Sequence, residues 1–146
     1  MTQLQTLNTE DFARLLHMTA HDWRTALDRR LRPLGLSRAT WMVLAFVRKL
    51  GSPNQTQLAD QLGLEGPSIV RLIDRLEREQ LVERRAGLDR RVKTVHLTPK
   101  GEELSAEIWR VAGHLRKELL RDIPIEEVER SMALLSQLHR RLEQLQ

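Results

Sequence analysis

Residues 65–101 constrain the fold of this chain more than any other segment. Their sequence, EGPSIVRLIDRLEREQLVERRAGLDRRVKTVHLTPKG, predicts an amphipathic helix, a short strand, an Arg-rich turn, a second strand and a new helix start. The helix has one apolar face, formed by Ile69, Leu72, Ile73 and Leu76. We expect strands over 81–85 and 92–97, joined by a tip of residues 86–91. This order predicts a winged helix-turn-helix, in a fold that is mainly α with a small β-hairpin wing.

Another helix lies directly ahead of this segment. A short apolar pattern ends at Gly63, and Pro67 occupies a favoured first-turn position of the following helix. Two short helices joined by a tight link that contains Gly are typical of a helix-turn-helix. Ser37 is the expected N-cap of the helix before this pair, and Thr98 is the expected cap after the hairpin.

Long amphipathic helices flank the winged helix. The first opens near Thr9, its expected N-cap, and its apolar stripe contains Phe12, Leu16, Ala20, Trp23, Leu27 and Leu31. The last helix has a near-heptad stripe that contains Ile125, Val128, Met132, Leu135, Leu142 and Leu145. Such a stripe needs a covering surface, either in its own domain or in a second subunit, and heptads favour the subunit. We therefore expect residues 1–36 and 101–146 to form N- and C-terminal dimerisation helices, and residues 37–100 to form the DNA-binding domain.

Basic residues are concentrated in the predicted winged helix. Residues 65–100 contain nine basic and six acidic residues, whereas residues 101–146 contain seven and nine. The helix face opposite the apolar stripe carries Ser68, Arg71, Arg75 and Arg78. Arg is suited to guanine edges and to phosphates, although an ordinary solvated helix also presents a charged face. Three acidic residues of this helix would repel phosphates unless they turn away or pair with Arg; they are Asp74, Glu77 and Glu79.

The hairpin adds a second basic element. Arg90 and Arg91 can project together from its tip, and a local basic cluster favours a polyanionic partner. Double-stranded DNA is therefore the leading partner. The alternative is a winged-helix dimer that serves protein–protein interaction or coats DNA without sequence preference. Salt-dependent affinity distinguishes phosphate contacts from a protein interface.

The composition excludes several other classes. The chain has no Cys, which removes disulfides, thiolate zinc sites and cysteine-based peroxide sensing. The N-terminal sequence lacks the pattern of a signal peptide, and no apolar run approaches the ~20 residues of a membrane span. We expect a soluble, cytoplasmic protein with no membrane partner.

Neither a metal site nor a catalytic site is expected. His17 and His21 are four residues apart on one helix and could share a metal, but no third ligand is evident nearby. The chain has no nucleophile elbow, phosphate loop, zinc-protease motif or recognisable carboxylate pair. We expect no cofactor and no enzymatic activity.

Three segments carry a family resemblance. The run DRRVKTVHLTPKG at residues 89–101 has the pattern D-x-R, an alternating strand and L-T-x-x-G. It resembles the wing and the following helix start of the MarR family of bacterial transcriptional regulators. The segment EGPSIVR at residues 65–71 resembles the recognition helix of the SlyA branch. Trp23-Arg24, residues 28–34 and Trp41 are similar to the same branch.

The resemblance implies a homodimer with interlaced terminal helices, bound to a pseudo-palindromic operator. Recognition helices would enter successive major grooves, and wings would reach flanking minor grooves. Ser68 and Arg71 map to groove contacts and Arg91 to the minor groove, while Asp89 would hold an Arg in position or serve only to form the turn. The predicted DNA-binding residues are Pro67, Ser68, Arg71, Arg75, Asp89, Arg90 and Arg91. Repression and activation would need the same surface, and repressor is the role we expect.

The resemblance also implies a small-molecule effector. Members of the family often respond to small aromatic acids such as salicylate, and four residues here would border the corresponding cleft: His21, Trp23, Arg24 and Trp41. An Arg or His would pair with a carboxylate while Trp covers the ring of an aromatic carboxylate or phenolic ligand. Alternatively, both Trp residues are core residues, the commoner role of large aromatics. Met18 and His21 stand where the SlyA branch is more basic, which weakens the inference for salicylate.

Overall fold

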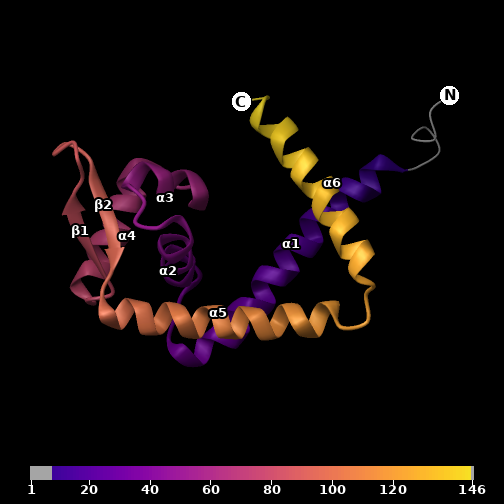
Figure 1. Cartoon of the computed structure of the whole chain (residues 1–146), viewed down its shortest axis with the longest axis horizontal. Helices are drawn as coiled ribbons and strands as arrows, with labels where there is room; N and C mark the ends of the chain where they lie inside the picture. Colours follow the sequence, from indigo (N-terminus) through magenta and orange to yellow (C-terminus); the bar gives the residue numbers. More distant parts are fainter. Residues whose placement is uncertain (1–7, 146) are drawn as a thin grey trace. The chain divides into compact units, whose positions relative to one another are not determined.

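The computed structural model describes residues 8–145 and is mainly helical with one antiparallel hairpin (Figure 1), which confirms the predicted fold class. Its elements are α1 (Thr9–Leu31), the 3₁₀ helix η2 (Arg32–Leu34), α2 (Arg38–Leu50), α3 (Gln55–Leu62), α4 (Gly66–Arg78), β1 (Val82–Ala86), β2 (Lys93–Leu97), α5 (Pro99–Leu120) and α6 (Ile125–Glu143). The chain forms two compact units, Met1–Gly113 and His114–Gln146. The helix-turn-helix and the hairpin belong to the first unit.

The helices begin and end at the capping residues that the sequence predicted, except at the start of α1. The Ser37 hydroxyl accepts the N–H of Thr40, as predicted, and Gly63 ends α3 with a left-handed φ of 64°. Thr98 caps α5, because its hydroxyl accepts the N–H of Gly101 at 3.0 Å. The prediction of Thr9 as the cap of α1 was wrong. Asn8 is the N-cap, because its carbonyl accepts the N–H of Asp11 at 3.1 Å and Thr9 is already helical.

The core of the first unit lies beneath α4. All four predicted apolar residues of this helix are buried: Ile69, Leu72, Ile73 and Leu76. Figure 1 shows α2, α3 and α4 gathered beside the hairpin, and each contributes fully buried side chains, among them Leu44 and Leu58. Burying one whole face of α4 fixes the rotation of the helix, so the polar face points outward.

The hairpin is fixed at its base to the loop before α3. The strands pair from Val82 opposite Leu97 to Ala86 opposite Lys93. Residues 53–54 add a further pairing, because the N–H of Val95 donates to the Pro53 carbonyl at 2.8 Å. The His96 ring strengthens this junction, since it hydrogen-bonds Ser52 and Thr94, each at 2.8 Å. The hairpin is therefore held by one segment, the loop of residues 52–54 that precedes α3.

The helices α1 and α6 each carry exposed apolar residues. In α1 only Leu27 and Leu31 are buried, while four apolar residues nearer its start are exposed: Phe12, Leu15, Leu16 and Met18. In the second unit α6 buries none of its residues, and its exposed apolar side chains include Ile125, Met132, Leu134, Leu135 and Leu142. Among residues 8–145, no helix is both long enough and apolar enough to cross a bilayer.

Candidate nucleic-acid interface

The N-terminal half of α4 presents a small polar surface. Pro67 and Arg71 are exposed, and Ser68 is close to them on the same turns of the helix. The Arg71 guanidinium reaches back toward the Ser68 hydroxyl, with Nη2 at 3.5 Å from Oγ. These residues lie on the first two turns of the helix, where the backbone approaches a ligand most closely. The structure therefore brings three of the predicted contact residues onto one exposed face.

Arg75, one turn further along, has a different environment. Its Nη2 donates to the Oγ1 of Thr40 on α2 at 3.1 Å, and its Nε lies 3.9 Å from Glu79. Thr40 is buried and also hydrogen-bonds the Ser37 hydroxyl at 2.9 Å. Arg75 thus links α4 to the first turn of α2.

The acidic residues Asp74 and Glu77 of α4 are paired with an arginine. Pairing was one of the two arrangements that the sequence left open, and turning away from the DNA was the other. Arg84 on β1 lies 2.7 Å from Asp74 and 3.0 Å from Glu77. Its Nε also donates to Gln55 of α3 at 2.7 Å, and its Nη2 donates to the Val70 carbonyl at 3.2 Å. The Arg84 side chain is only 14% exposed. One guanidinium therefore joins the hairpin, α3 and α4 and offsets one of the two negative charges beside the predicted contact face.

Arg84 was missed as a functional residue in the sequence. The available signal was the pair Asp74 and Glu77, which are three residues apart and share one helix face. Two carboxylates beside a face that is predicted to bind a polyanion require a nearby cation. The sequence does not say which of the neighbouring arginines supplies it.

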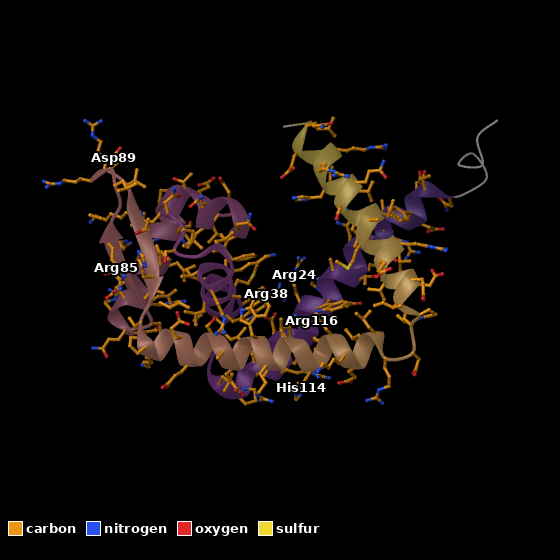
Figure 2. The ribbon with its side chains drawn as sticks, viewed as in Figure 1. Arg24, Arg38, Arg85, Asp89, His114 and Arg116 are labelled. Carbon is orange, nitrogen blue, oxygen red and sulfur yellow. The ribbon has the colours of Figure 1, made fainter. Side chains whose placement is uncertain are left out.

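The hairpin tip is a tight turn that presents basic side chains. The Asp89 carboxylate accepts the N–H of Arg91 at 3.0 Å, which is the geometry of a turn-forming Asp. Figure 2 shows Asp89 at the tip and Arg85 lower on β1. Arg85 pairs with Glu83 on its own strand, whereas Arg90 and Arg91 are exposed and make no ion pair among the described residues. The structure supports the turn role of Asp89 and leaves the two arginines available for a ligand.

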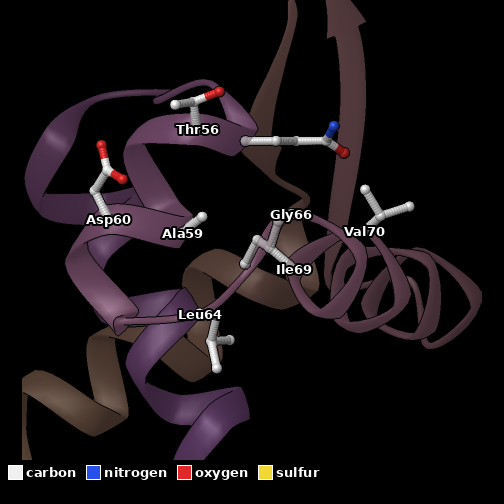
Figure 3. Close-up of a pocket in the computed structure, with 8 residues that line it drawn as sticks. Thr56, Ala59, Asp60, Leu64, Gly66, Ile69 and Val70 are labelled. Atoms are coloured by element: carbon white, nitrogen blue, oxygen red, sulfur yellow. The ribbon is translucent and has the colours of Figure 1, made fainter.

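Two open grooves flank α4. One, of about 420 Å³, lies between α4 and the hairpin and is lined by Gln55, Val70, Asp74, Arg84, Arg91 and Lys93. The other, of about 320 Å³, lies between α3 and α4 and is lined in part by Ala59, Leu64 and Ile69 (Figure 3). Val70 lines both grooves and is 39% exposed, although no pattern in the sequence singled it out. The surface around α4 is thus apolar at its centre and basic toward the wing.

The four predicted effector residues are not brought into either groove. His21 and Arg24 are exposed on α1, Trp23 is half-buried on the same helix, and Trp41 is buried in α2. The Trp41 indole donates to Asp28 of α1 at 2.7 Å. Its polar atom is therefore satisfied within the protein, as expected of a core aromatic.

Asp28 organises the contact between α1 and α2. Its carboxylate accepts hydrogen bonds from Trp41 and from the Nε of Arg38, both at 2.7 Å. Burial acts to raise the pKa of Asp28, but the hydrogen bonds from Arg38 and Trp41 and the charges of Arg38 and Arg32 outweigh it and lower the pKa below its usual value. Asp28 is thus held ionised between the two helices.

In the part of the chain that the structure describes, no three His, Cys, Asp or Glu side chains are grouped in a way that could hold a metal ion. His17 and His21 lie on exposed turns of α1.

The chain is similar to a known protein family and to several solved structures. Residues 34–92 match the sequence model described as MarR family. The chain is 42% identical to the transcriptional regulator PA3341, with a TM-score of 0.84 over 90% of this chain and 98% of that one. A mutant of MarR from E. coli complexed with operator DNA is 27% identical, with a TM-score of 0.74 over 88% and 93%. CouR from Rhodococcus jostii RHA1, bound to p-coumaroyl-CoA, is 25% identical, with a TM-score of 0.75 over 89% and 92%.

Proposed function

This chain belongs to the MarR family of transcriptional regulators, and from that premise we propose that it binds a specific operator as a homodimer. The operator is pseudo-palindromic, and each protomer places α4 in a major groove and its wing in the flanking minor groove. Residues 37–100 form the DNA-binding domain, and the helices of 1–36 and 101–146 join the protomers. Binding represses transcription where the operator overlaps the start of a gene.

The observation that carries the proposal is the shared surface of α4 and the hairpin. Pro67, Ser68 and Arg71 are presented by a helix whose rotation is fixed by burial, and Arg90 and Arg91 are presented by a turn closed by Asp89. Arg84 joins the two elements and offsets part of the negative charge between them. A basic surface built on rigid elements is what groove recognition requires. The MarR mutant complexed with operator DNA gives independent support.

The uncovered helices support a homodimer. The exposed apolar residues of α1 and α6 lie on the two elements that the sequence assigns to dimerisation. Exposed apolar stripes of this kind mark interaction surfaces, and a second copy of the chain presents the same stripes. Truncation after Asp122 should therefore leave a monomer in light scattering. A truncated chain that remains a dimer would contradict the role assigned to α6.

The same protein is proposed to respond to a small aromatic carboxylate or phenolic effector that releases it from DNA. His21, Trp23 and Arg24 offer two cationic or hydrogen-bonding groups and an aromatic ring on one stretch of α1. Trp41 contributes through its contact with Asp28, which links α1 to the winged helix. Support comes from CouR, a structurally similar protein that has been captured with p-coumaroyl-CoA bound.

The decisive experiment is fluorescence anisotropy of the protein with its own upstream DNA and with a scrambled duplex at several salt concentrations. Specific regulation requires tight binding to the first duplex and much weaker binding to the second. Arg91→Ala should weaken specific binding and make the salt slope shallower by roughly 0.9 for each phosphate that is no longer neutralised. Arg71→Ala should relax base preference if it contacts a base, or weaken binding to all duplexes equally if it contacts phosphate.

Arg130→Ala is the matched control, because it removes the same charge from an exposed position on α6. It should leave affinity and salt slope unchanged. Equal and strongly salt-dependent binding to both duplexes would favour non-specific coating of DNA. No binding at low salt would favour the protein-interaction alternative and end the operator proposal. Small aromatic acids are then tested for release of the specific complex.

A further inference from the structure

The hairpin tip carries an apolar side chain that the basic surface does not explain. Leu88 is 111% exposed relative to a reference chain, the largest value among the exposed large apolar residues of the described chain, ahead of Leu145 at 82%. A fully hydrated Leu forgoes the free energy of burial. An isolated exposed Leu on an ordinary surface needs no explanation, but this one lies in the turn that joins the two strands of the wing.

The turn around Leu88 is closed by hydrogen bonds. The N–H of Gly87 donates to the Val92 carbonyl at 2.9 Å, and the N–H of Val92 donates to the Asp89 carbonyl at 3.0 Å. A side chain at Gly87 would place its Cβ 3.0 Å from the Val92 carbonyl oxygen, so the tight approach favours Gly there. Leu88 is therefore held outward by a defined turn, which limits the conformational entropy that is given up when a partner buries it.

The surroundings of Leu88 identify the kind of partner. Arg90 and Arg91 follow it within three residues, and both are exposed without an ion pair in the described chain. Asp89 lies between Leu88 and the two arginines and uses its carboxylate to accept the Arg91 N–H, so the charged side chains of the tip have a net charge of +1. Unpaired cations are costly to desolvate against an apolar protein surface but complement a polyanion. The minor groove of DNA combines phosphates at its rims with base and sugar edges inside. Proteins that bind it frequently insert apolar side chains such as Leu between base steps.

We propose that Leu88 is an apolar wedge that enters the minor groove beside Arg90 and Arg91 and reads how easily the flanking base step deforms. This inference rests on the proposed operator binding and adds a specificity-determining residue to it. Pyrimidine–purine steps such as TA unstack more easily than AA steps. The wedge therefore favours operators with a TA step under the wing, at a position where no base edge is hydrogen-bonded.

Salt dependence separates a wedge from a phosphate contact. An apolar contact releases no condensed counterions, so removing it weakens binding without changing the salt slope. Removing an arginine that contacts a phosphate lowers the affinity and also makes the salt slope shallower. Partial burial of one Leu corresponds to roughly a three- to tenfold change in affinity for each wing.

The test compares Leu88→Ser, Leu88→Met and Arg90→Ala on two duplexes, one that includes the flanking minor grooves and one shortened to end before them. On the long duplex, where both wings of the dimer are in contact, Leu88→Ser should bind about ten- to a hundredfold more weakly, with an unchanged salt slope. Leu88→Met, which retains an apolar side chain, should bind as the unsubstituted protein does. On the short duplex all Leu88 variants should bind equally. Replacing a flanking TA step by AA should weaken the unsubstituted protein but not Leu88→Ser.

Three results would each contradict the wedge. In the first, Leu88→Ser binds the long duplex as tightly as the unsubstituted protein does. In the second, its affinity falls equally on the long and the short duplex, and in the third the loss of affinity is accompanied by a shallower salt slope. Because Leu88 makes no buried contact, circular dichroism of the variants should match the parent. If the unsubstituted protein binds the operator specifically and Leu88→Ser is unaffected, only the wedge fails. If the unsubstituted protein shows no specific binding, the operator proposal and the wedge fail together.

Discussion

Replacing Arg84 by Ala tests the central contact of the proposed interface. Arg84 joins β1 to Asp74 and Glu77, to Gln55 and to the Val70 carbonyl, and its side chain is only 14% exposed. The substitution removes two hydrogen bonds to neutral groups and two ion pairs. It also leaves both carboxylates without their partner.

The cost to stability follows from the exposure of each group. The side chains of Asp74 and Glu77 are 50% and 36% exposed, so water rehydrates them and each ion pair contributes only about 0.5–1 kcal/mol. The bonds to Gln55 and Val70 contribute about 0.5–1 kcal/mol each. We expect Arg84→Ala to lower the free energy of unfolding by about 2–3 kcal/mol. In a urea titration this corresponds to a midpoint lower by roughly 1 M, with an unchanged m value.

Arg85 provides the matched control on the same strand. It pairs with Glu83, but both side chains are largely exposed, at 59% and 47%. Arg85→Ala should therefore cost less than about 1 kcal/mol. If Arg84→Ala were no more destabilising than Arg85→Ala, the reasoning from burial and geometry would be wrong.

The effect of Arg84 on DNA binding has a distinct signature. Arg84→Ala exposes two negative charges beside the groove between α4 and the hairpin, so affinity should fall more than it does for an exposed arginine. Adding Asp74→Asn and Glu77→Gln to Arg84→Ala should restore much of the DNA affinity without restoring stability. No recovery in anisotropy would show that Arg84 acts by holding the wing in place rather than by masking charge.

Two further predictions concern the framework of the interface. Gly101→Ala should destabilise the fold by about 1–3 kcal/mol in thermal or urea unfolding, because the added Cβ would lie 2.0 Å from the Leu81 carbonyl oxygen; unchanged stability would contradict this close packing. Asp28 has a lowered pKa in the folded state, so its contribution to stability is complete above the unfolded pKa of about 3.9 and is lost as pH falls below it. Asp28→Asn should remove that part of the acid sensitivity, and an unchanged pH profile of unfolding would refute the assignment.

The sequence predicted those features that depend on local patterns. The burial of one face of α4 follows from apolar spacing, and the hairpin follows from two strand patterns joined by a Gly- and Asp-containing turn. The caps at Ser37 and Thr98 depend on residues three positions apart. The cap of α1 was misplaced by one residue because Asn8 and Thr9 are both good cap residues and their backbone conformation decides between them.

The sequence did not predict which side chains form hydrogen bonds between different helices. Asp28 and Trp41 are thirteen residues apart on two helices, and Arg75 and Thr40 are thirty-five apart. Such pairs depend on how helices cross, which periodicity does not encode. The likeness to the SlyA branch stays a prediction. So do the roles assigned to individual DNA and effector residues, because they concern contacts with other molecules.

Several basic residues of the winged helix already interact with protein groups, so fewer of them are available to bind phosphate than the sequence suggests. Of the nine basic residues in residues 65–100, Arg84 and Arg85 pair with carboxylates, Arg75 bonds Thr40, and Lys100 donates to the Glu79 carbonyl. Five make no ion pair among the described residues: Arg71, Arg78, Arg90, Arg91 and Lys93.

These five residues limit the phosphate neutralisation that residues 65–100 can supply, because the other four are already engaged with protein groups. In a homodimer, residues 65–100 then offer about ten available cationic side chains, and their contribution to the salt slope should be no steeper than about −9. The slope should be shallower still if Arg71 contacts a base, because base contacts release few counterions. A steeper slope for a single dimer per duplex would mean either that Arg75 or Arg84 leaves its protein partners on binding, or that basic residues outside 65–100 also contact phosphate.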